Sequence, residues 1–238
     1  MFVINIARLN IGIDEKYSHV KTICKDYIVH CDDIDFCISV TEEEIEAEQA
    51  LNDKKFSKGY CESICIYRKI CLRIPAFDAF LLHAAVIDVD GKCYAFSAKS
   101  GTGKSTHIML WKKLFGERCK IVNGDKPIIR RIDGKFYACG TPWCGKENLG
   151  ENMISPVAAF CFIERNEKNF VEDLSSNEIL SRIFHQLIIP TDKHTQDEFF
   201  ALLDDFLGCT PAHLVHCNMD LQAAQVASGR LLPAEQFG

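Results

Sequence analysis

Short apolar runs separated by turn and capping signals divide the first part of the chain. Strand-like runs come first, at residues 2–11, 27–31 and 36–40. A polar helix should follow over residues 41–56, because Thr41 and Glu44 form a capping-box pattern. Apolar residues at helical spacing over 60–74 predict a largely buried helix that ends before Pro75.

Strands dominate the middle of the chain. Residues 80–98 form a strand, an Asp90-Gly91 turn and a second strand, and residues 128–139 repeat this pattern around Asp133-Gly134. A further strand is predicted over 119–125, and the long apolar run over 155–165 is typical of a central strand buried on both faces. This pattern favours a sheet with several antiparallel neighbours.

The last third of the chain alternates helices with one strand. Helices are expected over 175–188 and 195–207, each opened by a capping box, Ser175 with Glu178 and Thr195 with Glu198. A strand over 212–217 and a helix over 220–232 complete the pattern. We therefore predict an α/β protein with a small N-terminal α+β lobe over 1–58 and a larger domain over 59–238.

The stretch "SAKSGTGKSTH" at 97–107 carries the most specific chemical signal. It lies between a strand and a helix and fits the Walker A form with alanine at the first glycine position. Glycines there turn backbone N–H groups toward phosphate oxygens, and the following helix N-terminus adds positive potential. The expected nucleotide-binding residues are Lys99, Ser100, Gly101, Thr102, Gly103, Lys104, Ser105 and Thr106. Lys104 would reach the β and γ phosphates, and Ser105 would ligate Mg²⁺.

Two acids could complete such a site. Asp125 follows the strand after the predicted phosphate loop and precedes Lys126, an arrangement suited to phosphoryl transfer. Glu164 closes the long apolar strand, as in an ATPase, although an acid beside Arg165 can also simply end a strand. The choice between transfer and hydrolysis depends on which acid faces the phosphates.

The position of His83 favours phosphoryl transfer over hydrolysis. His83 precedes Lys104 by twenty-one residues in "LLHAAVIDVDGKCYAFSAKSGTGKST", and with Asp125 after the loop this resembles the HPr kinase/phosphorylase family over residues 78–165. The alternative for His83 is a hydrogen-bonded core histidine. The resemblance implies a core shared with phosphoenolpyruvate carboxykinases, with a mixed, partly antiparallel sheet flanked by helices. It also implies that Asp125 is a base or Mg²⁺ ligand and that His83 lies near the transferred phosphoryl group.

The chain also departs from that family. The family usually has paired aspartates where this chain has "NGDKP", and its later segment with glutamate, arginine and glycines is replaced by "CGTPWCGKENLG". Phosphorylation of the HPr carrier protein and reverse phosphorolysis therefore do not follow from the resemblance. The chain looks more like short relatives associated with peptide-modification genes, including kinases of lasso-type peptides.

The "GTPWCGKE" segment is a further candidate for substrate contact. Gly140, Pro142 and Gly145 predict a rigid turn. Trp143 offers a stacking face, and Lys146 could meet phosphate or an acidic substrate. The structural alternative is a loop whose tryptophan fills the core.

Composition narrows the choice of partners. A net charge of −6 argues against broad nucleic-acid or membrane affinity, and no apolar run approaches the roughly 20 residues that span a bilayer. The thirteen cysteines lie mostly in apolar segments, so reduced thiols and a cytoplasmic location are expected. Zinc is disfavoured because the pairs Cys61/Cys65 and Cys139/Cys144 lack the usual spacing.

The sequence thus predicts an ATP- and Mg²⁺-dependent kinase. Asp125, Lys126 and His83 would act on a hydroxyl of a peptide, protein or small molecule, with Mg²⁺ held by Ser105 and Asp125. The alternatives are a P-loop ATPase that uses Glu164 and a nucleotide-binding adaptor of a peptide-maturation system. The acceptor, the choice of ATP or GTP, and assembly into a homo-oligomer stay open.

Overall fold

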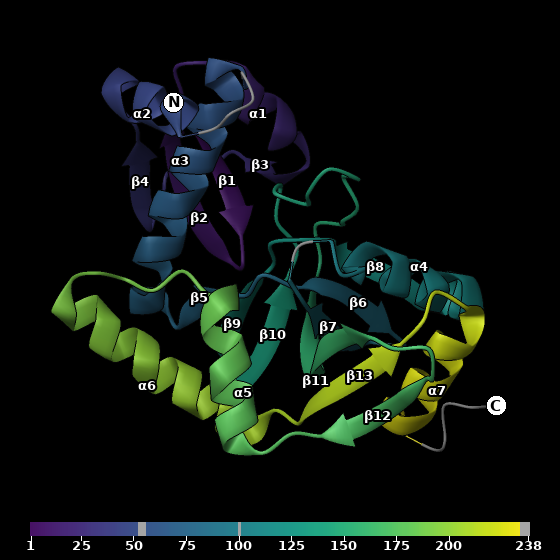
Figure 1. The fold of residues 1–238 in the computed structure, drawn as a ribbon. Helices are drawn as coiled ribbons and strands as arrows, with labels where there is room; N and C mark the ends of the chain where they lie inside the picture. Colours follow the sequence, from purple (N-terminus) through teal and green to yellow (C-terminus); the bar gives the residue numbers. More distant parts are fainter. Residues whose placement is uncertain (52–55, 100, 234–238) are drawn as a thin grey trace.

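The computed structural model describes residues 1–51, 56–99 and 101–233, which form two sheets (Figure 1). The smaller sheet has the strand order β3-β1-β2-β4. Its strands are β1 (Phe2–Ile6), β2 (Leu9–Asp14), β3 (Ile28–Val29) and β4 (Phe36–Ser39). The neighbouring helices are α1 (His19–Ile23), η1 (Lys25–Tyr27), α2 (Glu42–Ala50) and α3 (Lys58–Arg73). Apolar side chains of β1, β2 and α3 form one core.

The N-terminal elements follow the sequence pattern with three differences. The strand predicted over 27–31 is reduced to β3, because Tyr27 belongs to η1. The run predicted over 2–11 is a hairpin that turns at Ala7 and Arg8, both with positive φ. The capping box of α2 is confirmed, but α2 ends at Ala50, and residues 52–55 of the expected helix lie outside the described residues. The helix predicted over 60–74 is α3, and it ends before Pro75 as expected.

The larger sheet is mixed. Among the described residues it has nine strands, in the order β5-β9-β10-β11-β7-β6-β8, with β13 branching from β11 and β12 pairing with β13. They are β5 (Ala79–Leu81), β6 (Ala85–Val89), β7 (Lys92–Ser97), β8 (Cys119–Asn123), β9 (Ile128–Ile132), β10 (Lys135–Cys139), β11 (Ile154–Arg165), β12 (Phe170–Asp173) and β13 (Ala212–Cys217). Strand β11 runs parallel to β7 and β13 and antiparallel to β10. The prediction of a mixed sheet flanked by helices is therefore confirmed.

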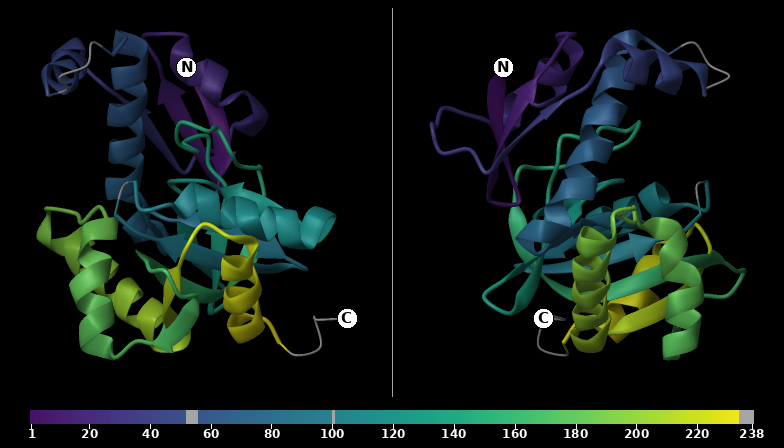
Figure 2. Two further views of the ribbon diagram at one scale, coloured as in Figure 1. Left: turned by 45° about the vertical axis from the view of Figure 1, so that its right-hand side comes forward. Right: turned by 90° about the vertical axis from the view of Figure 1, so that its left-hand side faces the viewer.

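Helices cover both faces of this sheet. The helical elements after α3 are η2 (Ile74–Phe77), α4 (Lys104–Phe115), η3 (Gly116–Arg118), α5 (Ser176–Ile183), η4 (Phe184–Gln186), α6 (Lys193–Cys209) and α7 (Leu221–Leu231). Trp111 of α4 and Ala224 of α7 share a core with Phe96 of β7. On the opposite face, Phe206 of α6 packs with Phe160 of β11, and Figure 2 shows α5 and α6 together on that side.

Turn and capping signals placed most of these elements correctly. Both Asp-Gly hairpins are present, with positive φ at Asp90 and Asp133 and at the glycine that follows each. The capping box predicted at Thr195 is wrong, because α6 begins earlier, at Lys193. The Asp192 carboxylate accepts a hydrogen bond from the Thr195 backbone N–H at 3.0 Å, so Asp192 caps the helix instead.

The strand predicted before the first hairpin is interrupted. Strand β5 pairs with β9, whereas β6 pairs with β7 and β8, and His83 lies in the break between β5 and β6. Backbone hydrogen bonds fix this break, since the His83 N–H donates to the Gln186 carbonyl at 2.8 Å and the Ala84 N–H donates to the Asp125 carbonyl at 3.1 Å. The break brings His83 next to Asp125.

Within the described ranges, we find no helix with the length and apolar character needed to cross a membrane. All thirteen cysteines are free. No group of three or more His, Cys, Asp or Glu side chains suited to a metal ion occurs in the described part of the chain.

Candidate functional site

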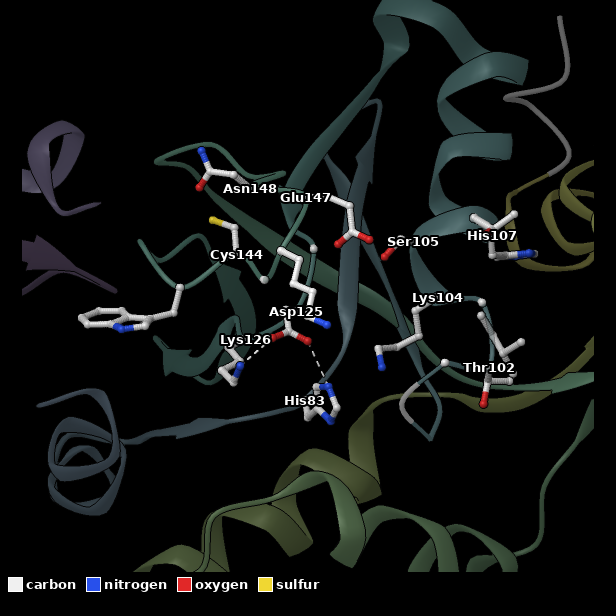
Figure 3. Close-up of a pocket in the computed structure, with 18 of the residues that line it drawn as sticks. His83, Thr102, Lys104, Ser105, His107, Asp125, Lys126, Cys144, Glu147 and Asn148 are labelled. Carbon is white, nitrogen blue, oxygen red and sulfur yellow. Dashed lines mark hydrogen bonds and ion pairs between the residues drawn. The ribbon is translucent and has the colours of Figure 1, made fainter. Parts of the chain in front are cut away.

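A cleft of about 1600 Å³ lies beside the N-terminal end of α4 (Figure 3). One wall is the β7–α4 loop with the first turn of α4, and the centre holds His83, Asp125 and Lys126. The loop that carries Trp143 and residues of α1 and α3 line the cleft toward the smaller sheet. Residues 165–167 and 217–220 line it next to α7. The larger sheet and the helices that neighbour the smaller sheet thus contribute to one cleft.

The β7–α4 loop needs glycine for conformational reasons. Gly101 and Gly103 have φ of +78° and +124°, and a Cβ at either position would meet nothing within 4 Å, so φ alone restricts the residue. Helix α4 starts at Lys104 with no side-chain cap, which leaves the N–H groups of its first turn available to a ligand. Of the other predicted residues, Ser100 lies outside the described residues and Lys99 is exposed beyond the cleft lining.

Arg165 at the end of β11 fixes this loop. Its Nε donates to the Thr102 carbonyl at 2.9 Å, and its Nη2 donates to the Gly101 carbonyl. A guanidinium presents several donors in a rigid plane, so it can hold two successive carbonyl groups at once. Arg165 therefore restrains the backbone of the loop, a role that the sequence pattern did not indicate.

Hydrogen bonds hold the Asp125 side chain and the turn that carries it at the centre of the cleft. Its Oδ1 accepts from His83 Nε2 at 3.0 Å, and its Oδ2 accepts from Lys126 Nζ at 2.6 Å. The Asn123 side-chain oxygen accepts from the backbone N–H groups of Asp125 and Lys126, at 2.8 and 2.7 Å. The turn after β8 thus fixes the backbone, while His83 and Lys126 fix the carboxylate.

These contacts decide the charge of the carboxyl group. Burial acts to raise the pKa of Asp125, but hydrogen bonds from His83 and Lys126 and the positive charge of Lys126 outweigh it. The net result holds the pKa of Asp125 well below its ordinary value. Asp125 is therefore a carboxylate at neutral pH, able to accept a proton or to bind a cation.

Lys104 extends from the start of α4 into the same space. Its Nζ donates to the Ala98 carbonyl at 3.1 Å, and Figure 3 shows the side chain directed into the cleft between α4 and Asp125. Burial lowers the pKa of Lys104, and attraction to Asp125 opposes that shift. Lys104 is thus a cation positioned beside the carboxylate and the uncapped helix end.

Glu164 faces the opposite side of the sheet. Ile163 and Arg165 line the cleft, and because side chains alternate along a strand, Glu164 points away from it. There it forms an ion pair with Arg182 of α5. The geometry therefore favours Asp125 over Glu164 as the acid near a nucleotide bound at the β7–α4 loop.

Trp143 joins the loop over residues 140–150 to α3. Its ring stacks on Tyr67 with centroids 4.1 Å apart, and its Nε1 donates to the Ser63 carbonyl at 3.1 Å. One indole face is therefore already used for packing, as in the structural alternative for this segment. Lys146 is exposed and lines the cleft, so its predicted contact with substrate stays open.

Glu147 is a cleft residue that the sequence analysis missed. Figure 3 shows its carboxylate directed from the loop toward the end of α4 that carries Ser105. The loop lies close to the central acid, since a Cβ at Gly145, which has φ of +81°, would stand 3.0 Å from the Asp125 Cβ. Glu147 enters the site because this loop approaches Asp125 closely. No local sequence signal predicts that approach.

The residues present fit a magnesium ion. Mg²⁺ takes oxygen ligands and usually combines one or two protein oxygens with water and phosphate oxygens. Ser105 and Asp125 both line the cleft, and the ionised Asp125 has lone pairs beyond those that accept from His83 and Lys126. The donor set is thus of the right chemical type.

Comparisons with known proteins add little to this geometry. No family model matches the chain, and no curated protein matches it by sequence. Among solved structures, the Hpr(Ser) kinase/phosphatase from Coxiella burnetii is similar with a TM-score of 0.39 and 12% sequence identity. The match covers 65% of this chain and 98% of the other. The functional argument below therefore rests on the site itself.

Proposed function

We propose that this chain is an ATP- and Mg²⁺-dependent phosphotransferase that moves the γ-phosphoryl group to a hydroxyl of a peptide, protein or small molecule. One observation carries the proposal. An ionised carboxylate, Asp125, is held by His83 and Lys126 in the same cleft as Lys104 and the uncapped start of α4. A phosphotransferase needs both an anion-binding loop and a fixed acceptor for the hydroxyl proton.

The proposed role of each residue follows from its position in the cleft. Backbone N–H groups of the β7–α4 loop and Lys104 bind the phosphates and neutralise the charge that develops on the leaving group. Asp125 orients the acceptor hydroxyl and accepts its proton. His83 and Lys126 keep the carboxylate ionised and restrict its rotation, so that little reorganisation precedes the transfer.

Ser105 and Asp125 are the residues that would hold Mg²⁺. The bound ion would supply charge neutralisation between the β and γ phosphates. Glu147 lies on the wall of the cleft that the loop over residues 140–150 forms. Its carboxylate is directed toward Ser105 and is a further acidic group near the proposed Mg²⁺ site.

The acceptor approaches from the side of the smaller sheet. The cleft continues past Asp125 to Tyr60 and Ile64 of α3 and to Ile23 of α1. His19, Ser63 and Arg68 also line this part, so it offers apolar, aromatic and polar contacts. The cleft volume of about 1600 Å³ is large enough for a further ligand beside a nucleotide. We propose that residues 1–58 form a lobe that, together with α3, serves as the acceptor wall.

The fate of labelled phosphate tests the proposal. The protein is incubated with Mg²⁺, γ-labelled ATP and an extract of its own host cells, and labelled products are identified by mass spectrometry. Label on a hydroxyl of a discrete acceptor is the expected result. Free phosphate alone indicates an ATPase instead, and bound ATP without turnover indicates an adaptor.

A further inference from the structure

His107 carries a hydrogen-bond donor that no described residue satisfies. The side chain is 2% exposed, and its Nε2 lies 3.0 Å from the Trp111 Nε1. Indole nitrogen only donates, so His107 Nε2 must be the unprotonated acceptor and the proton must be on Nδ1. His107 Nδ1 is buried and has no hydrogen-bond partner in the described part of the chain. An unsatisfied buried donor is costly, so an acceptor atom supplied by a bound ligand or a water would stabilise this N–H group.

The place of His107 limits what that acceptor can be. His107 lines the cleft, one helical turn after Lys104, and Figure 3 shows it on the far side of Ser105 from Asp125. Residues 217–220, before α7, line the same end of the cleft. This end is therefore opposite to the part that holds His83 and Asp125.

The remaining groups at this end are suited to a planar, partly apolar ligand. Met219 is 75% exposed although it lines the cleft, so an apolar surface is open there. The Asn218 side chain is already bound within its own loop, since it accepts from the Asp220 N–H at 3.0 Å and donates to the Glu167 carbonyl at 3.3 Å. His107 is thus the buried polar side chain here with a free hydrogen bond.

The direction of a bound nucleotide points to the same end. If Asp125 lies on the acceptor side of the γ phosphate, in-line transfer places the leaving ADP on the opposite side, which is the end of the cleft lined by Ser105, His107 and residues 217–220. We infer that the cleft between His107 and residues 217–220 is the nucleoside subsite, in which His107 Nδ1–H donates to an acceptor atom of the purine or ribose, directly or through one water. This inference rests on the proposed nucleotide-binding function.

The nucleoside subsite is tested with two ligands that differ only by adenosine. Binding of Mg-ADP and of Mg-pyrophosphate is measured by titration calorimetry for the wild type, His107→Gln and His107→Asn. Glutamine can still accept from Trp111 but has no donor at the Nδ1 position, whereas the asparagine amide places a donor near that position. We expect His107→Gln to weaken ADP binding about tenfold, with pyrophosphate binding unchanged within about twofold. His107→Asn should keep most of the wild-type ADP affinity.

Trp111→Phe is the control for lost packing. It removes the hydrogen bond that fixes the tautomer of His107, but the ring can still carry its proton on Nδ1 when an acceptor is bound. Trp111→Phe should lower stability without changing the ratio of ADP to pyrophosphate affinity. Equal losses for both ligands in His107→Gln, or no loss for either, would overturn the nucleoside subsite and leave nucleotide binding intact. A wild-type protein that binds neither ligand would refute the proposed function and this inference together.

Discussion

Replacing Asp125 by asparagine isolates the charge of the central carboxylate. The amide keeps one acceptor oxygen, so it can still receive a hydrogen bond from either His83 or Lys126. Its NH₂ group faces the other partner, and the ion pair with Lys126 is lost because the side chain no longer carries a charge. The shape of the site is otherwise unchanged, which makes the substitution a test of chemistry rather than of packing.

The substitution should affect the rate of phosphoryl transfer far more than the stability of the fold. Lys126 is 44% exposed and can turn toward water, so the loss of that ion pair costs at most about 1 kcal/mol. A neutral His83 can present its other tautomer to the amide, which keeps the total destabilisation to about 1–2 kcal/mol. Loss of a positioned base slows transfer roughly 10²–10⁴-fold, equivalent to about 3–5 kcal/mol of activation free energy.

The assay compares Asp125→Asn with Glu164→Gln, a matched removal of the acid on the other face of the sheet. Transfer of label from γ-labelled ATP and ADP affinity are both measured. We expect Asp125→Asn to lose transfer while binding Mg²⁺-free ADP within about threefold of the wild type, and Glu164→Gln to retain transfer within about twofold. Full transfer by Asp125→Asn, or its loss in Glu164→Gln, would refute the reasoning.

Three further predictions concern the surroundings of the site. Arg165→Met releases both loop carbonyls and should weaken ADP binding about tenfold in titration, with little change in the free energy of unfolding. Trp143→Ala removes the ring stacked on Tyr67 and should lower the free energy of unfolding by about 3–5 kcal/mol in chemical denaturation. Burial lowers the pKa of His107 to about 4, so the folded state stays neutral while the unfolded chain takes up a proton below about pH 6.5. Stability should therefore fall by about 3 kcal/mol between pH 7 and pH 4 in denaturation experiments, and His107→Gln should lack this part of the loss. Wild-type pH dependence in that variant would contradict the assignment.

Local sequence signals predicted those turns whose own residues favour the backbone conformation that the turn requires. Both Asp-Gly hairpins could be predicted because these residues tolerate positive φ. The turn at Ala7 and Arg8 could not, since neither residue favours that conformation. Arg130, far away in the sequence, donates to the Ala7 carbonyl, so a tertiary contact supports this turn.

In the site, too, residues marked by their sequence order could be predicted, and residues placed by tertiary contacts could not. His83, Lys104 and Asp125 could be selected from their order and spacing, and they meet in one cleft. Glu147 and Arg165 could not, because their roles depend on the path of a loop and on which face of β11 a side chain occupies. The strand pattern alone does not say which of Glu164 and Arg165 faces the cleft.

A crystal structure with Mg²⁺ and a non-hydrolysable ATP analogue tests the central claim most directly. We predict that the γ phosphate lies within hydrogen-bond distance of Lys104 Nζ, with the Asp125 carboxylate on its acceptor side and the nucleoside beside His107. A γ phosphate remote from Asp125, or a nucleotide bound outside the β7–α4 loop, would contradict the account.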